Sequence, residues 1–203
     1  MRKFTVLIIT CVILAGIPNV VGVIRDKALL RNQIIRLHVV GQSDSEADQN
    51  LKLYVKDAVV QYLRENIPQD IDTAQAKACL QQLLEKLQDV ANLAVKEAGG
   101  DECVGVSLEK EAFPQRKYDT FSLPSGVYES LRITIGEGNG KNWWCVVFPS
   151  LCLGTTVEEY RSLAVGAGLS ESVVSATAGD EPYEIRFFLL DCIGKLENFF
   201  HFR

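Results

Sequence analysis

Cys145 and His38 are the residue types that a thiol-dependent hydrolase uses as nucleophile and general base. In such an enzyme the imidazole takes the proton of the thiol, and the two side chains meet in space without being close in sequence. No catalytic signature surrounds Cys145, and a single histidine in an alternating strand is usually a half-exposed strand residue. Thiol hydrolysis is therefore an alternative function, and the sequence assigns no catalytic residue.

Cys145 and Cys152 are also candidates for a disulfide bond, because they flank Pro149 in a Cys-x6-Cys arrangement. A bend at this proline could bring the two Cα atoms within the roughly 4.4–6.8 Å that a disulfide requires, whereas a continuing strand would separate them. Cys79 and Cys192 lie on or near apolar stripes and are expected in the core. Four ligands at zinc-finger spacing are absent from the sequence, so we expect no metal site.

The segment Gly136–Lys141 (Gly-Glu-Gly-Asn-Gly-Lys) superficially resembles a phosphate-binding loop. Its spacing does not fit, since Ile135 occupies the position of the first P-loop glycine and Asn142 that of the Mg²⁺-binding hydroxyl. We therefore expect neither a nucleotide nor another small-molecule cofactor. Asn139-Gly140 is instead typical of a tight β-hairpin turn between the two flanking strands.

Residues 1–22 have the pattern of a signal peptide, because Arg2 and Lys3 precede an uncharged apolar run. We expect cleavage after Gly22. If the leader is not cleaved, the run from Phe4 to Ile24 is about long enough to anchor the chain in a bilayer, which takes roughly 20 apolar residues. Either outcome places the rest of the chain outside the cytoplasm, so the hydrolase alternative is an extracytoplasmic enzyme.

The composition excludes several classes of protein. The 203 residues are 47% hydrophobic and 23% charged, which is ordinary for a globular domain and excludes global disorder. Because 21 basic and 26 acidic residues give a formal net charge of −5, we expect no general attraction for nucleic acid or anionic lipid. Contact with a membrane is expected only through the leader or through a receptor.

Four strands are predicted from the alternation of apolar and polar side chains. They lie at residues 34–40, 104–108, 127–135 and 143–148. In the last of these strands the alternation should turn one of Trp143 and Trp144 inward as core and leave the other outward.

Two amphipathic helices are predicted between the first two strands. The first is capped by Ser43, Asp44 or Ser45 and ended by Ile67-Pro68, and its Lys52 and Lys56 should face water. The second runs from Asp72-Thr73 to Gly99-Gly100. The fold class is therefore α+β: an antiparallel-rich sheet with both helices packed on one face, forming a two-layer sandwich at residues 23–154.

The last third of the chain has a different composition. Residues 155–182 are rich in Ser, Thr, Gly and Ala without a sustained period, which predicts a flexible linker. Residues 183–203 return to helical spacing, and Gly194 should weaken this helix by roughly 1 kcal/mol relative to Ala. Its apolar stripe could dock on the domain or rest on a membrane. We expect docking, because interfacial helices usually carry a Lys/Arg-rich polar face and this helix mixes both signs.

The chain resembles the stage II sporulation protein R family of endospore-forming bacteria in three segments. These are residues 35–52, residues 126–129 (Gly-Val-Tyr-Glu) and, above all, residues 136–152 with the core Asn-Trp-Trp-Cys-Val-Val-Phe-Pro. The resemblance covers roughly residues 34–152, with a weaker match at 184–190.

Proteins of this family look like secreted signals, and the resemblance implies a function of that kind. The forespore would make the protein and export it into the space between the forespore and mother-cell membranes. There it would trigger a membrane-embedded aspartic protease, its partner, which cleaves the precursor of sigma factor E. By resemblance the chain is an activator and not an enzyme.

The resemblance brings no established catalytic residue. We expect the receptor-binding surface to include the predicted hairpin at Gly136–Trp144 and the turn at Gly41–Ser45. The receptor-binding candidates are His38, Ser43, Asp44, Lys141, Asn142, Trp143 and Trp144.

Overall fold

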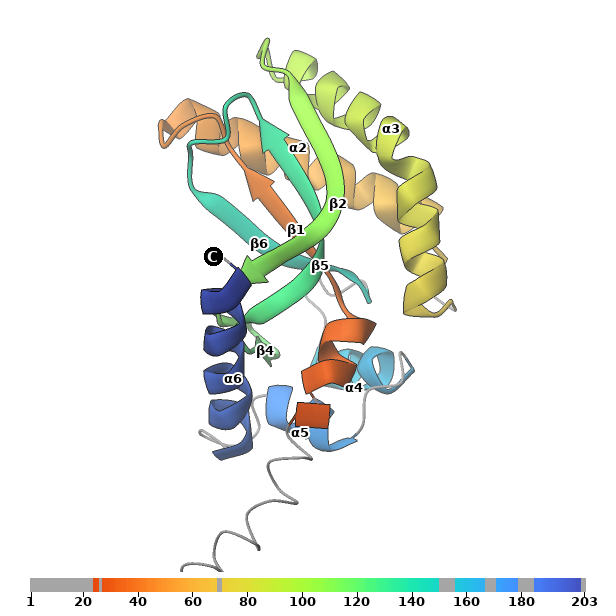
Figure 1. Cartoon of the computed structure of the whole chain (residues 1–203). Coiled ribbons are helices and arrows are strands. Elements are labelled where there is room, and N and C mark those ends of the chain that lie inside the picture. Colours follow the sequence, from red (N-terminus) through yellow and green to blue (C-terminus); the bar gives the residue numbers. More distant parts are fainter. Residues whose placement is uncertain are drawn as a thin grey trace, which may run out of the picture.

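A four-stranded sheet with the order β2-β5-β1-β6 forms the centre of the protein (Figure 1). The structure, a computed structural model, describes residues 24–25, 27–68, 71–149, 156–166, 171–178 and 185–201. β1 runs parallel to β5, and the pairs β1–β6 and β2–β5 are antiparallel. The predicted α+β class with a mostly antiparallel sheet is confirmed. The strands are β1 (Ile35–Val40), β2 (Val104–Phe113), β5 (Gly126–Ile135) and β6 (Asn142–Phe148).

Two long helices, α2 (Glu46–Asn66) and α3 (Thr73–Glu97), follow β1 and form the main core with one face of the sheet. Ser45 caps α2 by accepting a hydrogen bond from the Asp48 amide, and Asp72 forms a capping box with Gln75 at the start of α3. Both helices therefore begin where the sequence predicts, and their apolar stripes pack on the side chains that alternate along β1 and β5.

The predicted exposure of Lys52 is wrong. Its side chain is buried, and Nζ donates hydrogen bonds to Gln49 Oε1 at 2.6 Å and to the Lys141 carbonyl at 2.8 Å. Lys56 also packs inward, since its Nζ lies 5.0 Å from the centroid of the Trp143 ring. The cause is the loop before β6, which lies over the first turns of α2 and supplies a carbonyl for Lys52.

The predicted β-hairpin at Asn139-Gly140 is also wrong. β5 and β6 do run in opposite directions, but β1 lies between them and pairs with both. The chain reverses with positive φ angles at Gly136 (+58°) and Gly138 (+66°), where glycine avoids the strain that a side chain would cause. Residues 136–141 therefore form a loop that crosses over the end of β1.

The predicted linker, residues 155–182, contains two helices, α4 (Val157–Gly166) and α5 (Glu171–Thr177). Their buried residues join a second apolar cluster, in which Tyr160 stacks on Phe121 with the ring centroids 4.7 Å apart. Phe121 precedes β4 (Ser122–Leu123), which pairs with β3 (Arg116–Lys117) in a small second sheet. The sequence pattern misses α4 and α5 because helices of 10 and 7 residues are too short to show a sustained period.

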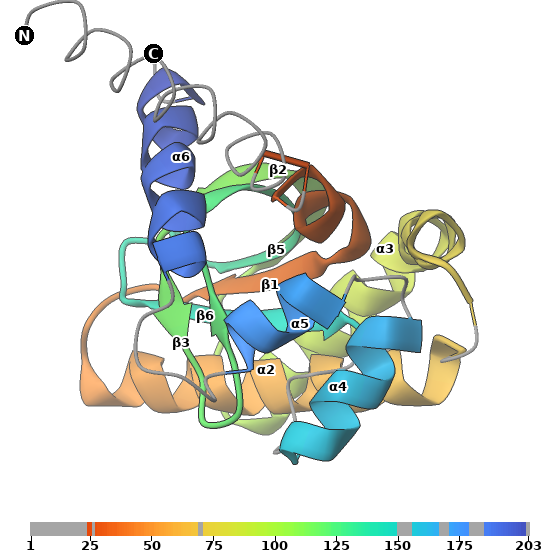
Figure 2. The same cartoon turned by 90° about the horizontal axis from the view of Figure 1, so that it is seen from below.

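The C-terminal helix α6 (Ile185–His201) forms as predicted and packs against β5 and β2. Figures 1 and 2 show α6 and α3 on opposite sides of the sheet. The stripe that we expected to dock does not dock, since Phe188, Leu196 and Phe199 are more than half exposed. The docking face instead combines the fully buried Leu190 with Asp191 and Gly194.

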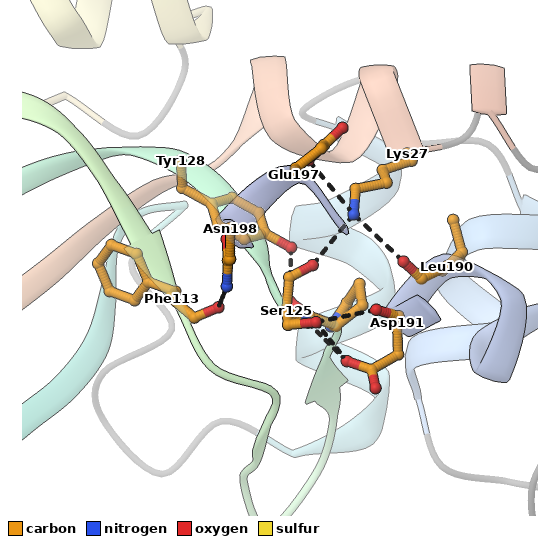
Figure 3. Close-up of polar contacts among 9 residues, drawn as sticks. Lys27, Phe113, Ser125, Tyr128, Leu190, Asp191, Glu197 and Asn198 are labelled. Atoms are coloured by element: carbon orange, nitrogen blue, oxygen red, sulfur yellow. Dashed lines mark hydrogen bonds and ion pairs between the residues drawn. The ribbon is translucent and has the colours of Figure 1, made fainter. Parts of the chain in front are cut away.

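Ser125 is the centre of this docking contact (Figure 3). Its amide and its hydroxyl donate to Oδ1 of Asp191 at 2.9 and 2.7 Å, and its carbonyl accepts from Nζ of Lys27 at 3.1 Å. Lys27 also donates to the Leu190 carbonyl at 3.2 Å, and Asn198 donates to the Phe113 carbonyl at 2.9 Å. Hydrogen bonds to buried groups, and not apolar contacts alone, hold α6 in place.

Within the described ranges, no helix combines the length and the apolar content that crossing a membrane requires. The predicted leader, residues 1–22, lies outside these ranges.

Gly194 should be required for the docking of α6, although alanine is the better helix former by roughly 1 kcal/mol. A Cβ atom at this position would lie 1.6 Å from the Ser125 carbonyl oxygen, which is backbone and cannot move aside. Gly194→Ala should therefore lower the free energy of unfolding by about 1–3 kcal/mol or more, measured by urea denaturation.

Gly166→Ala is the matched control, because a Cβ atom there would meet no atom within 4 Å. It should leave stability unchanged or slightly raised. A Gly194→Ala protein as stable as wild type would contradict the docking contact.

Candidate functional site

His38 is the centre of a polar cluster on the face of the sheet that α2 and α3 do not cover. Its Nδ1 donates to Oε1 of Glu111 on β2 at 2.9 Å, and its Nε2 lies 2.8 Å from Oδ1 of Asn142 on β6. The imidazole stacks on Trp144 with 3.8 Å between the ring centroids. Because both ring nitrogens are bonded and the side chain is buried, the ring has one fixed orientation.

Arg132 on β5 completes the cluster by donating from Nη1 to Oε1 of Glu111 at 2.6 Å. Burial opposes ionisation of this carboxyl group, but the hydrogen bonds and positive charge of its neighbours prevail and lower the pKa of Glu111 from 4.5 to about 2. Glu111 is therefore a carboxylate throughout the physiological range and joins β1, β2 and β5 through one side chain.

A pocket of about 590 Å³ opens beside this cluster. Its lining combines the aromatic face of Trp144 with charged groups of both signs, and Asn198 and His201 from the end of α6 form part of its wall. The cluster residues that line it are His38, Glu111, Arg132, Asn142 and Trp144. The pocket can offer hydrogen bonds and a flat aromatic surface to an amphipathic segment of another molecule.

Arg36 lies two residues before His38 and points to the same face of the sheet. It is fully buried, its Nη2 donates to the Tyr118 hydroxyl at 2.9 Å, and its guanidinium carbon lies 4.1 Å from the centroid of the Phe113 ring. Desolvation lowers the pKa of Arg36, and the Tyr118 hydroxyl opposes this shift. The aromatic rings thus replace part of the lost hydration of a buried cation.

Ser43 and Asp44 lie where the turn after β1 meets the loop before β6. The Asp44 carboxylate accepts from the Lys141 amide at 2.7 Å, and the Gly41 carbonyl accepts from the Gly140 amide at 2.9 Å. Ser43 donates from its hydroxyl to the Asp48 carboxylate in the first turn of α2. Gly140 is packed so closely that a Cβ atom would lie 2.3 Å from the Ser43 carbonyl oxygen. These contacts join the two loops into one rigid unit.

Lys52, on α2, also contacts this unit. Desolvation lowers the pKa of Lys52, while attraction to Asp44 raises it. Its hydrogen bond to the Lys141 carbonyl fixes the residue just before β6 begins.

The two tryptophans have different surroundings, as the alternation predicts. Trp144 is half-buried between His38 and Phe113, with a ring centroid distance of 4.7 Å to Phe113. Trp143 points to the opposite face and is 37% exposed, beside the ammonium group of Lys56. Trp144 therefore belongs to the polar cluster, and Trp143 is available to a partner.

Cys145 and His38 do not form a nucleophile and base pair. Cys145 is opposite Leu37 and His38 is opposite Trp144, so the thiol position and the imidazole point to different faces of the sheet. Cys145 is packed in the main core and its sulfur is in a disulfide bond. Cys152, its predicted partner, lies outside the described residues, and Cys79, Cys103 and Cys192 are free.

The structure thus divides the predicted residues among three places. His38, Asn142 and Trp144 meet in the pocket; Ser43, Asp44 and Lys141 meet where the loops join; and Trp143 lies on the other face of β6. Glu111, Arg132, Arg36 and Lys52 were missed. For three of them the sequence carries a signal, since Arg36 and His38, Ser130 and Arg132, and Glu109 and Glu111 are polar pairs at strand spacing.

The low pKa of Glu111 should make the stability of the fold depend on pH in acid. A carboxyl group with a lowered pKa contributes stability that is present above its ordinary pKa and is lost as the pH falls from about 4.5 to about 2. Glu111→Gln should lower the free energy of unfolding at pH 7 by on the order of 2 kcal/mol. The variant should also lose less stability than wild type between neutral and acid pH in urea denaturation.

Glu109→Gln is the matched control, because this neighbouring carboxylate is 46% exposed and lies 3.9 Å from Arg132. Its effect should be within about 0.5 kcal/mol at every pH. Equal pH dependence in wild type and Glu111→Gln would disprove the role of Glu111.

Comparison with known proteins identifies the family of this fold. The sequence profile described as stage II sporulation protein R matches residues 31–158. A curated relative, stage II sporulation protein R of Bacillus subtilis (strain 168), is 30% identical over 186 residues, which are 83% of this chain and 83% of the relative. No solved structure matches the chain. The matched region contains the sheet, both long helices and every residue of the polar cluster, and the chain belongs to the stage II sporulation protein R family.

Proposed function

We propose that this protein is an exported signal of sporulation that activates a membrane-embedded aspartic protease, which then cleaves the precursor of sigma factor E. Membership of the stage II sporulation protein R family carries the proposal and supports a role in sporulation. The apolar leader with its two preceding cations supports export into the space between the forespore and mother-cell membranes.

The chemistry of the site supports recognition rather than catalysis. A general base needs a free nitrogen near its substrate, whereas both ring nitrogens of His38 are bonded to protein groups. Cys145 is in a disulfide bond and lies in the core, so it offers no thiolate. A polar cluster of this kind fixes the shape of a surface.

The start of β6 is the surface that we assign to the receptor. Lys141, Asn142 and Trp143 are exposed, and their backbone is fixed by the contacts with Asp44 and Lys52. A tryptophan on a rigid support buries a large area on a partner at little entropic cost, which is typical of interface hot spots. β6 is also an edge strand, so a partner can approach it from the side.

Trp143→Ala should separate signalling from folding. Because Trp143 is only 37% exposed and contacts Lys56, its loss should lower the free energy of unfolding by about 1–3 kcal/mol and still leave a folded protein. Cleavage of the sigma factor E precursor in sporulating cells should fall at least about tenfold, as expected for a hot-spot residue. The measurement is an immunoblot of the precursor, with urea denaturation of the purified protein.

Two further variants serve as controls. Tyr54→Ala removes an aromatic side chain that is 47% exposed on α2 and donates to Glu97, so it should cost a similar amount of stability but leave cleavage nearly unchanged. Trp144→Ala should destabilise the fold by about 2 kcal/mol or more, because it removes the ring that stacks on His38. Full precursor cleavage with Trp143→Ala would refute the assigned surface.

A further inference from the structure

Along residues 188–201 of helix α6, four large apolar side chains face solvent, while Leu190 and Asp191 are buried against the protein. Phe188, Leu196, Phe199 and Phe200 are 54%, 61%, 57% and 70% exposed, and we call these four residues the apolar stripe. Phe188 lies eight residues before Leu196, and Phe199 and Phe200 lie three and four residues after it, so all four residues lie along one side of the helix. Asp191, on the other side, is buried against Ser125. An ordinary surface helix exposes few large apolar side chains, so a group of four on its solvent side is unusual.

The residue types of the apolar stripe favour lipid over protein as its partner. Phenylalanine and leucine offer no hydrogen-bonding group, whereas protein hot spots are enriched in Trp, Tyr and Arg. Acyl chains need no directional partner, and Phe and Leu are common on the inserted face of interfacial helices. Leu93 and Val165 are also exposed, but they lie singly on α3 and α4, as is normal for a protein surface.

The position of α6 gives a second, independent argument. Lys27 lies five residues after Gly22, the expected end of the leader, and its Nζ bonds to the Leu190 carbonyl and lies 3.4 Å from Glu197 (Figure 3). Five residues span at most about 17 Å. A leader in a membrane therefore brings α6 close to that membrane for as long as the leader remains attached.

We propose that the apolar stripe of α6 inserts into the surface of a lipid bilayer. The polar contacts on the opposite side of the helix join α6 to β5 and β2. Insertion would therefore fix how the sheet, and the pocket whose wall includes Asn198 and His201, is oriented relative to the membrane. The net charge of −5 gives no general attraction to anionic lipid, so apolar insertion carries the binding. The inference rests on the proposed function only for the expectation that the leader reaches a membrane.

The test is sedimentation of the chain from Val23 to Arg203 with phosphatidylcholine vesicles. This chain lacks the apolar leader, which would itself bind lipid, and it keeps both hydrophobic clusters, whose buried residues all follow Lys27. The protein should bind, and high salt should not release it. The double variant Leu196→Gln/Phe200→Gln should bind at least about tenfold more weakly.

Leu93→Gln is the matched control, because it makes the same change at a residue that is 57% exposed on α3, and it should bind like wild type. Circular dichroism should show the same helix content for all variants, since glutamine is a good helix former. Three results overturn the proposal: no binding by the wild-type chain, equal binding by the double variant, or a homodimer in solution that the double variant dissociates. None of these measurements involves the protease, so failure here is distinct from failure of the proposed function.

Discussion

The pairing of β1 with both β5 and β6 is the constraint on which the rest of the structure depends. Since β1 and β5 are parallel, the chain needs a long connection between them, and α2, α3 and β2 provide it. Since β6 lies on the other side of β1, the loop after β5 must cross the end of β1. This crossing brings residues 136–141 onto the turn that begins α2, where Asp44 and Lys52 fix them.

The same central position places Arg36 and His38 in the middle of the sheet, where both side chains are buried. Burying two such side chains is costly unless neighbouring strands supply partners. Glu111 and Asn142 bind the imidazole, while Phe113 and Tyr118 contact the guanidinium. The partners come from β2, β6 and the residue after β3, so they meet only when the strands are in this order. Among the described residues, Nε and Nη1 of Arg36 have no hydrogen-bond partner, and the aromatic rings compensate only part of that cost. We infer that the cluster specifies the topology as well as the surface.

Sequence periodicity predicts the strands, both long helices and their caps, because each depends on residues close together in the chain. It fails where the structure of a residue depends on segments that are distant in the sequence. Asn139-Gly140 indicates that the chain reverses its direction. Only the strand order shows that β1 lies between the two strands that this reversal connects, β5 and β6. Lys52 is charged and by pattern faces water, yet its ammonium group donates a hydrogen bond to a carbonyl 89 residues away. Glu111 and Arg132 are ordinary strand residues until the sheet places them beside His38.

Helix α6 shows most clearly why a pattern of apolar residues gives a helix but not its orientation. The hydrophobic effect alone would turn Phe188, Leu196 and Phe199 inward. Burying them would expose Asp191 and Asn198, and would leave the amide of Ser125 and the carbonyl of Phe113 without these hydrogen bonds at the edge of the core. Gly194 adds a steric term, because only a residue without a side chain allows the helix to approach Ser125. Specific polar contacts therefore determine the orientation of α6, and its apolar face is left for a partner outside the fold.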